Sequence, residues 1–100
     1  MKFKYMVSLQ MRGRTDEEIR DALARVEAIV KDSFGEDAVR LETHNKEFKD
    51  KPLKGLSASI GLMADANLVI FVGDYAQARG CKIEHEIAER YSIPRMYVTL

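Results

Sequence analysis

The sequence has one cysteine and no net charge, and each of these features excludes some classes of protein. The single cysteine, Cys81, cannot form a disulfide within the chain, so the fold does not depend on a disulfide framework. The 16 Lys and Arg balance the 16 Asp and Glu, which gives no reason to expect nucleic acid or an anionic membrane as a partner. No apolar run approaches the roughly 20 residues that span a bilayer, and no signal-peptide core is evident. We therefore expect a cytoplasmic protein.

What the sequence does contain is enough apolar material for one core. Its 100 residues are 46% hydrophobic, which favours a single domain over residues 1–100. Four segments rich in apolar, β-branched or aromatic residues are predicted as strands: residues 3–9, 38–41, 68–72 and 95–100. Helical spacing of apolar residues predicts three helices: one after a capping box at Thr15 and stopped by Gly35, one beginning at Pro52, and one over residues 80–91.

Strands that alternate with helices predict an α/β fold, a small doubly wound parallel sheet of about four strands with three helices, of Rossmann-like or flavodoxin-like type. The continuous apolar run at residues 68–72 is typical of a strand buried on both faces, and we place it at the centre of the sheet. In such sheets ligands bind beyond the carboxyl ends of the strands, where the strand order reverses. The loops at residues 10–14 and 73–79 therefore mark the expected ligand edge.

The first of these loops contains Arg12 and Gly13 and leads into a predicted helix N-terminus. Free backbone N–H groups and the helix dipole favour an anion at such an end, and glycine permits close approach of a ligand, so the loop suits a phosphate. The alternative is that the arginine is a solvated loop charge and the glycine only a turn. The glycines and lysine of a Walker loop are absent.

Two carboxylates lie near the same edge. Glu84 is expected in the first turn of the third helix and borders its apolar stripe, where partial burial would perturb its pKa and suit a catalytic role. A favourable interaction with the helix dipole alone would also explain a glutamate there. Asp74 follows the central strand and could supply the second carboxylate of a glycosidic site, or it could be an ordinary turn residue.

Metal chemistry finds no support in the residue pattern. His44 and His85 are far apart in the sequence, and neither has a Cys or His at ligand spacing, so we predict no metal site. Cys81 has no evident partner base and is interpreted as a small packing residue.

Two sequence motifs resemble the nucleoside 2-deoxyribosyltransferase superfamily, and most closely its small phage and prophage members. The stretch GCKIE at residues 80–84, between ADANLVIFV and HEIAE, has the family's glycine, Gly80, four residues before its nucleophilic glutamate, Glu84. The stretch SLQMRG at residues 8–13 is similar to the first loop of the deoxynucleoside 5′-monophosphate N-glycosidases. In that branch the loop holds the phosphate with backbone N–H groups, a serine and an arginine, which correspond to Ser8, Arg12 and Gly13.

The sequence also departs from the family's pattern. Ala78 replaces a substrate-holding serine or aspartate, and Ser57 stands where the family has its base-facing acid. Leu9 and Gln10 replace a small residue and proline in the first loop, and the family's fifth strand has no counterpart after residue 100. These departures concern activity more than fold.

The resemblance implies an N-glycosidase or deoxyribosyltransferase for 2′-deoxynucleosides or their 5′-monophosphates, with Glu84 as nucleophile and no cofactor. Asp74 would assist, and Ser8, Arg12, Gly13, Ser57, Arg79 and Gly80 would bind the substrate. The partner expected is a small nucleoside or nucleotide rather than nucleic acid or a membrane, and so small a core favours a homo-oligomer. The alternatives are a nucleotide-binding protein without turnover and an interaction module.

Overall fold

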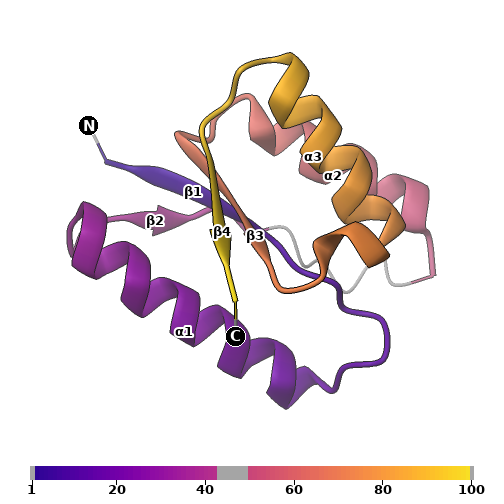
Figure 1. Ribbon diagram of the computed structural model, residues 1–100, viewed down its shortest axis with the longest axis horizontal. Helices are drawn as coiled ribbons and strands as arrows, with labels where there is room; N and C mark the ends of the chain where they lie inside the picture. Colours follow the sequence, from indigo (N-terminus) through magenta and orange to yellow (C-terminus); the bar gives the residue numbers. More distant parts are fainter. Residues whose placement is uncertain (1, 43–49, 100) are drawn as a thin grey trace.

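The computed structural model describes residues 2–42 and 50–99. Strands and helices follow one another along the chain, with a short 3₁₀ helix (η2) after the third strand (Figure 1). The elements are β1 (Lys4–Ser8), α1 (Asp16–Phe34), β2 (Val39–Arg40), α2 (Pro52–Met63), β3 (Leu68–Val72), η2 (Tyr75–Gln77), α3 (Arg79–Arg90) and β4 (Arg95–Val98).

The four strands form one parallel sheet in the order β2-β1-β3-β4. Helix α1 covers one face, and α2 and α3 cover the other (Figure 1). The expected doubly wound α/β fold is therefore confirmed, as is the central place of β3, whose five residues are all buried. The chain reverses direction across the sheet between β1 and β3, so the switch point lies where these neighbouring strands end.

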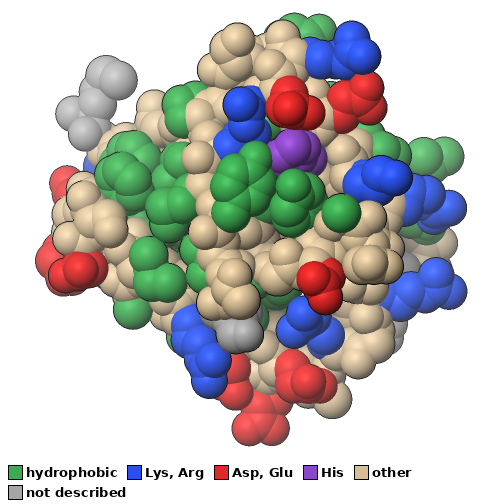
Figure 2. Space-filling view, in the orientation of Figure 1, with side chains coloured by type: hydrophobic (Ala, Val, Ile, Leu, Met, Phe, Trp, Pro, Cys, Tyr) green, Lys and Arg blue, Asp and Glu red, His purple; other side chains and the backbone are tan. Residues whose placement is uncertain are grey.

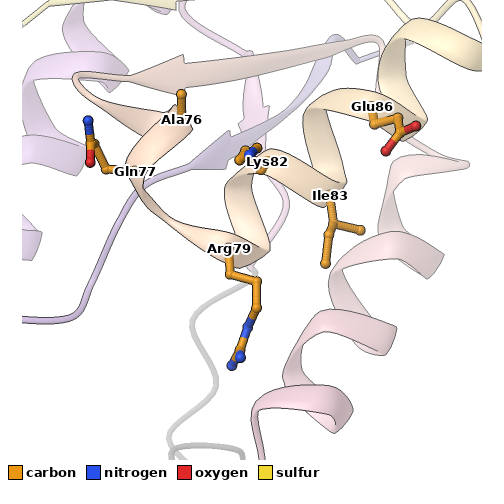
Figure 3. Close-up of a pocket in the computed structure, with 6 residues that line it drawn as sticks. All are labelled: Ala76, Gln77, Arg79, Lys82, Ile83 and Glu86. Carbon is orange, nitrogen blue, oxygen red and sulfur yellow. The ribbon is translucent and has the colours of Figure 1, made fainter.

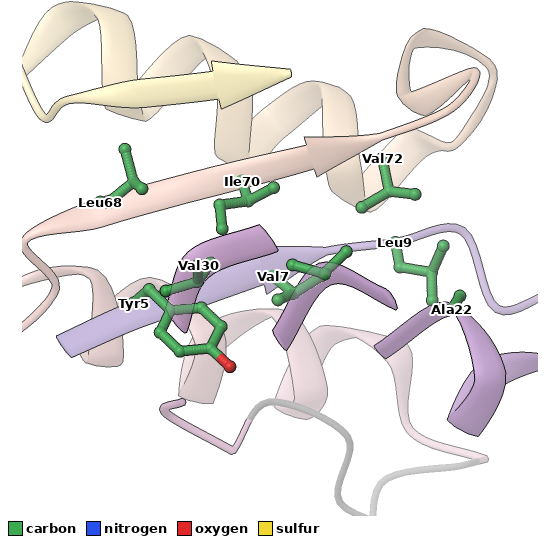
Figure 4. Packing of buried hydrophobic residues seen from close by; sticks show 9 residues of the cluster. Tyr5, Val7, Leu9, Ala22, Val30, Leu68, Ile70 and Val72 are labelled. Carbon is green, nitrogen blue, oxygen red and sulfur yellow. The ribbon is translucent and has the colours of Figure 1, made fainter. Parts of the chain in front are cut away.

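Side-chain alternation along β1 and β3 divides the core into two parts. On one face Tyr5, Val7 and Leu9 pack against α1 together with three residues of β3, as Figure 4 shows: Leu68, Ile70 and Val72. On the other face Met6 packs with Val69 and Phe71 of β3 and with α2 and α3. Every second residue of β1 therefore points toward α2 and α3.

The ends of α1 follow the sequence signals closely. Thr15 Oγ1 accepts a hydrogen bond from the Glu18 N–H, and the Glu18 carboxylate accepts one from the Thr15 N–H, which completes the expected capping box. Gly35 ends the helix at a φ of 112°, in a region that favours glycine.

Other element bounds differ from the sequence expectation by a few residues. Strand β2 has two residues rather than four, β1 spans residues 4–8 rather than 3–9, and η2 occupies part of the expected loop at residues 73–79. Helix α3 begins at Arg79, one residue earlier than expected, because Ala78 is the last extended residue. The expected loop at residues 42–51 and the expected end of the last strand lie partly outside the described residues.

Candidate functional site

Glu84 lies on α3 at the interface with the sheet and with α2. Because α3 begins at Arg79, Glu84 is in the second turn, and the expectation that it lies in the first turn is wrong. Its side chain is only 7% exposed, although glutamate is almost never buried to this extent without a partner. The helix dipole acts mainly within the first turn, so it does not account for this carboxylate.

Ser8, the last residue of β1, is the hydrogen-bond partner of Glu84. Its hydroxyl donates to Glu84 Oε1 at 2.9 Å, and the serine itself is 2% exposed. The alternation along β1 explains this meeting, since Ser8 shares the face of Met6 and points toward α3. A bond between residues 76 apart in the sequence thus joins the end of β1 to α3 at the switch point.

A second buried serine, Ser59 of α2, lies beside the same carboxylate. Its hydroxyl donates to the Gly55 carbonyl at 3.1 Å and is close enough to Glu84 to lower the pKa of that carboxyl group. Sequence reasoning missed Ser59 and selected Ser57, which is exposed on α2. The signal was present, because Ser59 lies three residues after Leu56 and four before Met63, in the apolar stripe of the helix.

Burial dominates the electrostatics of the site. Desolvation raises the pKa of Glu84 above its ordinary value of 4.5, and the hydrogen bond from Ser8 and the nearby hydroxyl of Ser59 offset only part of that increase. Desolvation also raises the pKa of the neighbouring Cys81 thiol, which the negative charge of Glu84 raises further. Cys81 is therefore a protonated, buried thiol, in agreement with a packing role.

A groove between α2 and α3 reaches the turn of α3 above Glu84. It has a volume of about 450 Å³ and is lined by Pro52, Leu53, Leu56, Arg79, Gly80 and Ile83. Gly80 and Glu84 are four residues apart, on the same side of the helix. A Cβ atom built on Gly80 would meet no atom within 4 Å, so the groove is open over this residue. The groove is therefore a mostly apolar cavity with one arginine, one helical turn from the buried carboxylate.

A second hollow lies on the outer side of α3. It has a volume of about 430 Å³ and is lined by Ala76, Gln77, Arg79, Lys82, Ile83 and Glu86 (Figure 3). Arg79 extends toward α2 in this view and borders both hollows. Glu84 lines neither hollow. We assign the site to the groove between α2 and α3 because that groove, unlike the outer hollow, is lined by Gly80, one turn from Glu84 on the same side of α3.

The loop after β1 holds Arg12 and Gly13 at the carboxyl edge of the sheet, both exposed. Gly13 has a φ of 82°, and the Arg14 N–H donates to the Met11 carbonyl at 3.1 Å, so the segment is a tight turn. The N-terminus of α1, which follows this loop, is less suited to binding an anion than the helix dipole alone would suggest. Its capping box uses two of the N–H groups, and its first turn contains three acidic residues. An anion at this loop would depend on Arg12 and on backbone groups of the turn.

Asp74 is exposed in the loop after β3 and immediately precedes η2. No hydrogen bond or ion pair among the described residues joins Asp74 or Arg12 to Glu84. The structure thus brings Ser8, Gly80 and Glu84 into one site with the unexpected Ser59, and it leaves Arg12, Gly13 and Asp74 on the loops at that edge. Arg79 lies at the mouth of the groove.

Comparison of the chain with protein-family models, with curated proteins and with solved structures gives no match. Over residues 2–42 and 50–99, no group of three or more His, Cys, Asp and Glu residues is arranged to hold a metal ion. In the same part of the chain, no helix is both long enough and apolar enough to cross a membrane. His44, considered above, lies outside the described residues.

Proposed function

We propose that the protein is an N-glycosidase or deoxyribosyltransferase of the nucleoside 2-deoxyribosyltransferase type, acting on 2′-deoxynucleosides or their 5′-monophosphates. The observation that carries the proposal is the Glu84 carboxylate, buried at the switch point of the sheet, bonded to Ser8 and one turn below an open groove. Burying an ionisable group costs stability, and such sites are enriched in catalytic residues.

Glu84 is the nucleophile in this proposal. Its carboxylate oxygen attacks the anomeric carbon, the bond to the base breaks with its electron pair leaving on the base, and a glycosyl ester forms. Water or a second base then releases the sugar from the ester. Ser8 orients the Glu84 carboxylate by its hydrogen bond to Oε1. Because Ser8 and Ser59 are both neutral, they do not neutralise the negative charge of the carboxylate as a cation would. Once ionised, a carboxylate with a raised pKa is more basic than an ordinary carboxylate and is therefore a stronger nucleophile.

The remaining roles are proposed from the family resemblance. The groove between α2 and α3 receives the apolar face of the substrate beside Gly80. Ser57 of α2, which follows the groove residue Leu56 in the chain, binds the substrate. Arg12, the backbone at Gly13 and Arg79 hold the phosphate, and Asp74 binds a sugar hydroxyl or acts as acid or base. The chemistry needs no cofactor, and the reduced thiol of Cys81 suits a cytoplasmic setting.

A nucleotide-binding protein without turnover is the second candidate, and specific observations favour it. Ala78 has no hydroxyl to hold the substrate, and the exposed Ser57 cannot protonate a leaving base as an acid would. The raised pKa of Glu84 favours its protonated form, which would donate a hydrogen bond to a ribose hydroxyl instead of attacking carbon.

The test incubates the purified protein with each 2′-deoxynucleoside and each 5′-monophosphate and follows free base by chromatography. Glu84→Gln, prepared in parallel, controls for contaminating enzymes. Base release by the parent protein that is lost in the variant supports glycosidase or transferase activity. A nucleotide-induced rise in melting temperature without base release supports the binding protein. An interaction module would show neither response.

We further propose that the protein forms a homodimer, because large apolar side chains remain exposed on its surface. Phe34 at the end of α1 and Val39 of the edge strand β2 are 43% and 37% exposed. A second copy would remove such side chains from water. Light scattering at tens of micromolar is expected to give the mass of a dimer, and a monomer at that concentration would contradict this proposal.

A further inference from the structure

Four aromatic rings meet where β4 borders α3, away from the groove. Phe71 of β3, Tyr75 of η2, His85 of α3 and Tyr97 of β4 contribute one ring each. All six pairs of ring centroids lie between 4.9 and 5.9 Å apart. Offset and edge-on contacts at such distances are favourable, so the His85 imidazole is held in place by packing on several sides.

The two nitrogens of His85 face different partners. Nε2 lies 2.6 Å from the Tyr97 hydroxyl oxygen, a short hydrogen bond. Nδ1 lies 3.6 Å from Glu89 Oε1, one helical turn along α3, which is an electrostatic contact rather than a hydrogen bond. A carboxylate beside Nδ1 favours the tautomer with its proton on Nδ1, which leaves Nε2 free to accept the Tyr97 O–H. Glu89, His85 and Tyr97 thus form an ordered series of acid, base and hydroxyl.

This hydroxyl belongs to a side chain that solvent reaches. Tyr97 is 53% exposed on β4, which is an edge strand. In Figure 2 a histidine side chain is visible at the surface beside hydrophobic side chains. Met96 and Val98 pack toward the α1 face, so Arg95 and Tyr97 alternate onto the opposite face. Within residues 2–42 and 50–99, the bond found for the Arg95 guanidinium is a long one of 3.4 Å to the Ile93 carbonyl, which leaves its other N–H groups available to an anion near Tyr97.

We propose that Tyr97 is a nucleophilic tyrosine that accepts a phosphoryl group, with His85 as its general base. The donor is a phosphoanhydride: the Tyr97 oxygen bonds to its terminal phosphorus, the bond from that phosphorus to the bridging oxygen breaks, and the remaining phosphate departs with the electron pair. The phenolic proton passes to His85 Nε2 and from there to solvent or to the leaving group. Glu89 positions His85, and Arg95 stabilises the charge that develops on the phosphoryl oxygens. No part of the Glu84 site is required.

The probe for this proposal is an alkyl fluorophosphonate, which transfers its phosphorus to oxygen with loss of fluoride. Peptide mass spectrometry then measures the labelling rate of each tyrosine in the folded protein. Tyr91 is the internal control, since it is 77% exposed and therefore more accessible than Tyr97. General-base assistance contributes roughly a hundredfold or more in rate. We therefore expect Tyr97 to react at least about tenfold faster than Tyr91, against the order of exposure.

Two variants separate activation from accessibility. His85→Phe keeps a ring in the aromatic cluster but removes the base, and it is expected to reduce Tyr97 labelling to the rate of Tyr91. Glu89→Gln changes an exposed side chain and leaves all four rings of the cluster in place, and it is expected to lower the Tyr97 rate by a smaller factor. If His85→Phe does not fold, the proposal is still tested by the labelling rates of Tyr97 and Tyr91 in the parent protein and in Glu89→Gln. Labelling of Tyr91 at least as fast as Tyr97 in the parent, or a Tyr97 rate unchanged by a folded His85→Phe, would overturn the proposal.

Discussion

Replacing Glu84 by glutamine tests whether the buried carboxylate opposes the stability of the fold. Glutamine keeps the size of the side chain and an oxygen that can accept the Ser8 hydrogen bond, but it removes the charge. Leaving a buried polar group poorly solvated costs about 1 to 3 kcal/mol, and the amide retains part of that cost. We expect Glu84→Gln to raise the free energy of unfolding at pH 7.5 by about 1 kcal/mol, which is about 4 to 8 °C in Tm for a domain of this size.

The pH dependence of this difference has a definite sign. Burial raises the pKa of Glu84 in the folded state, so the folded protein binds the proton more tightly than the unfolded chain. The wild type therefore loses stability as the pH rises from the ordinary value of 4.5 through the raised folded pKa. The variant has no such group. Its advantage is expected to be full above the raised folded pKa and to shrink as the pH falls through that pKa toward 4.5, below which the carboxyl group is protonated in both states.

Urea denaturation of both proteins between pH 4 and 8 measures the difference, because the titration of other groups cancels. Glu86→Gln is the matched control on the same helix. Glu86 is exposed and forms an ion pair with Arg90 at 3.1 Å, so its loss is expected to change stability by less than about 0.5 kcal/mol. The reasoning is refuted if Glu84→Gln destabilises the protein at neutral pH, or if its effect does not depend on pH.

Three further substitutions probe the groove, the phosphate and the serine. Gly80→Ala improves helix propensity by up to about 1 kcal/mol and places a methyl group in the open groove, so it is expected to raise Tm. The same methyl group is expected to weaken nucleotide binding at least about tenfold. Unchanged binding in a thermal-shift titration would contradict the groove as the ligand site. Arg12→Ala is expected to weaken monophosphate binding by about 1.5 to 3 kcal/mol and leave nucleoside binding nearly unchanged. If Arg79→Ala, and not Arg12→Ala, weakens monophosphate binding selectively, the phosphate site is at Arg79 in the groove and not at the loop after β1. Ser8→Ala removes the hydrogen-bond donor to the buried Glu84 carboxylate and is expected to lower the free energy of unfolding, measured by urea denaturation at neutral pH, by about 1.5 to 3 kcal/mol. Ser57→Ala changes an exposed serine and is expected to leave that free energy nearly unchanged. Equal effects of the two substitutions would count against the bond from Ser8 to Glu84.

The fold could be predicted because its local signals agree with one another. The apolar run of β3, the capping box at Thr15 and the stop at Gly35 each specify a local structure, and the alternation of elements then fixes a parallel sheet. The carboxyl ends of all strands in a parallel sheet lie at one edge, so the expected ligand edge required only the fold class.

The interior of the site depended on packing that the sequence shows only indirectly. Glu84 is the sixth residue of α3, and counted from the expected start at Gly80 it would be the fifth, so it lies beyond the first turn of about 3.6 residues from either start. Ser59 escaped notice because hydroxyls in helices usually bond back to a carbonyl, as Ser59 does to Gly55, and its nearness to Glu84 depends on how α2 packs on α3. The bond from Ser8 to Glu84 likewise arises only when β1 and α3 are packed together.

A trapping experiment tests most directly the claim that Glu84 is a nucleophile. A 2′-fluorinated deoxynucleotide slows hydrolysis of a glycosyl ester because fluorine destabilises the oxocarbenium-like transition state, so an ester once formed persists. Peptide mass spectrometry after incubation is predicted to find the mass of the fluorinated sugar phosphate on Glu84, and to find none in Glu84→Gln. Release of free base without any adduct on Glu84, or an adduct on Asp74 in its place, would contradict the claim.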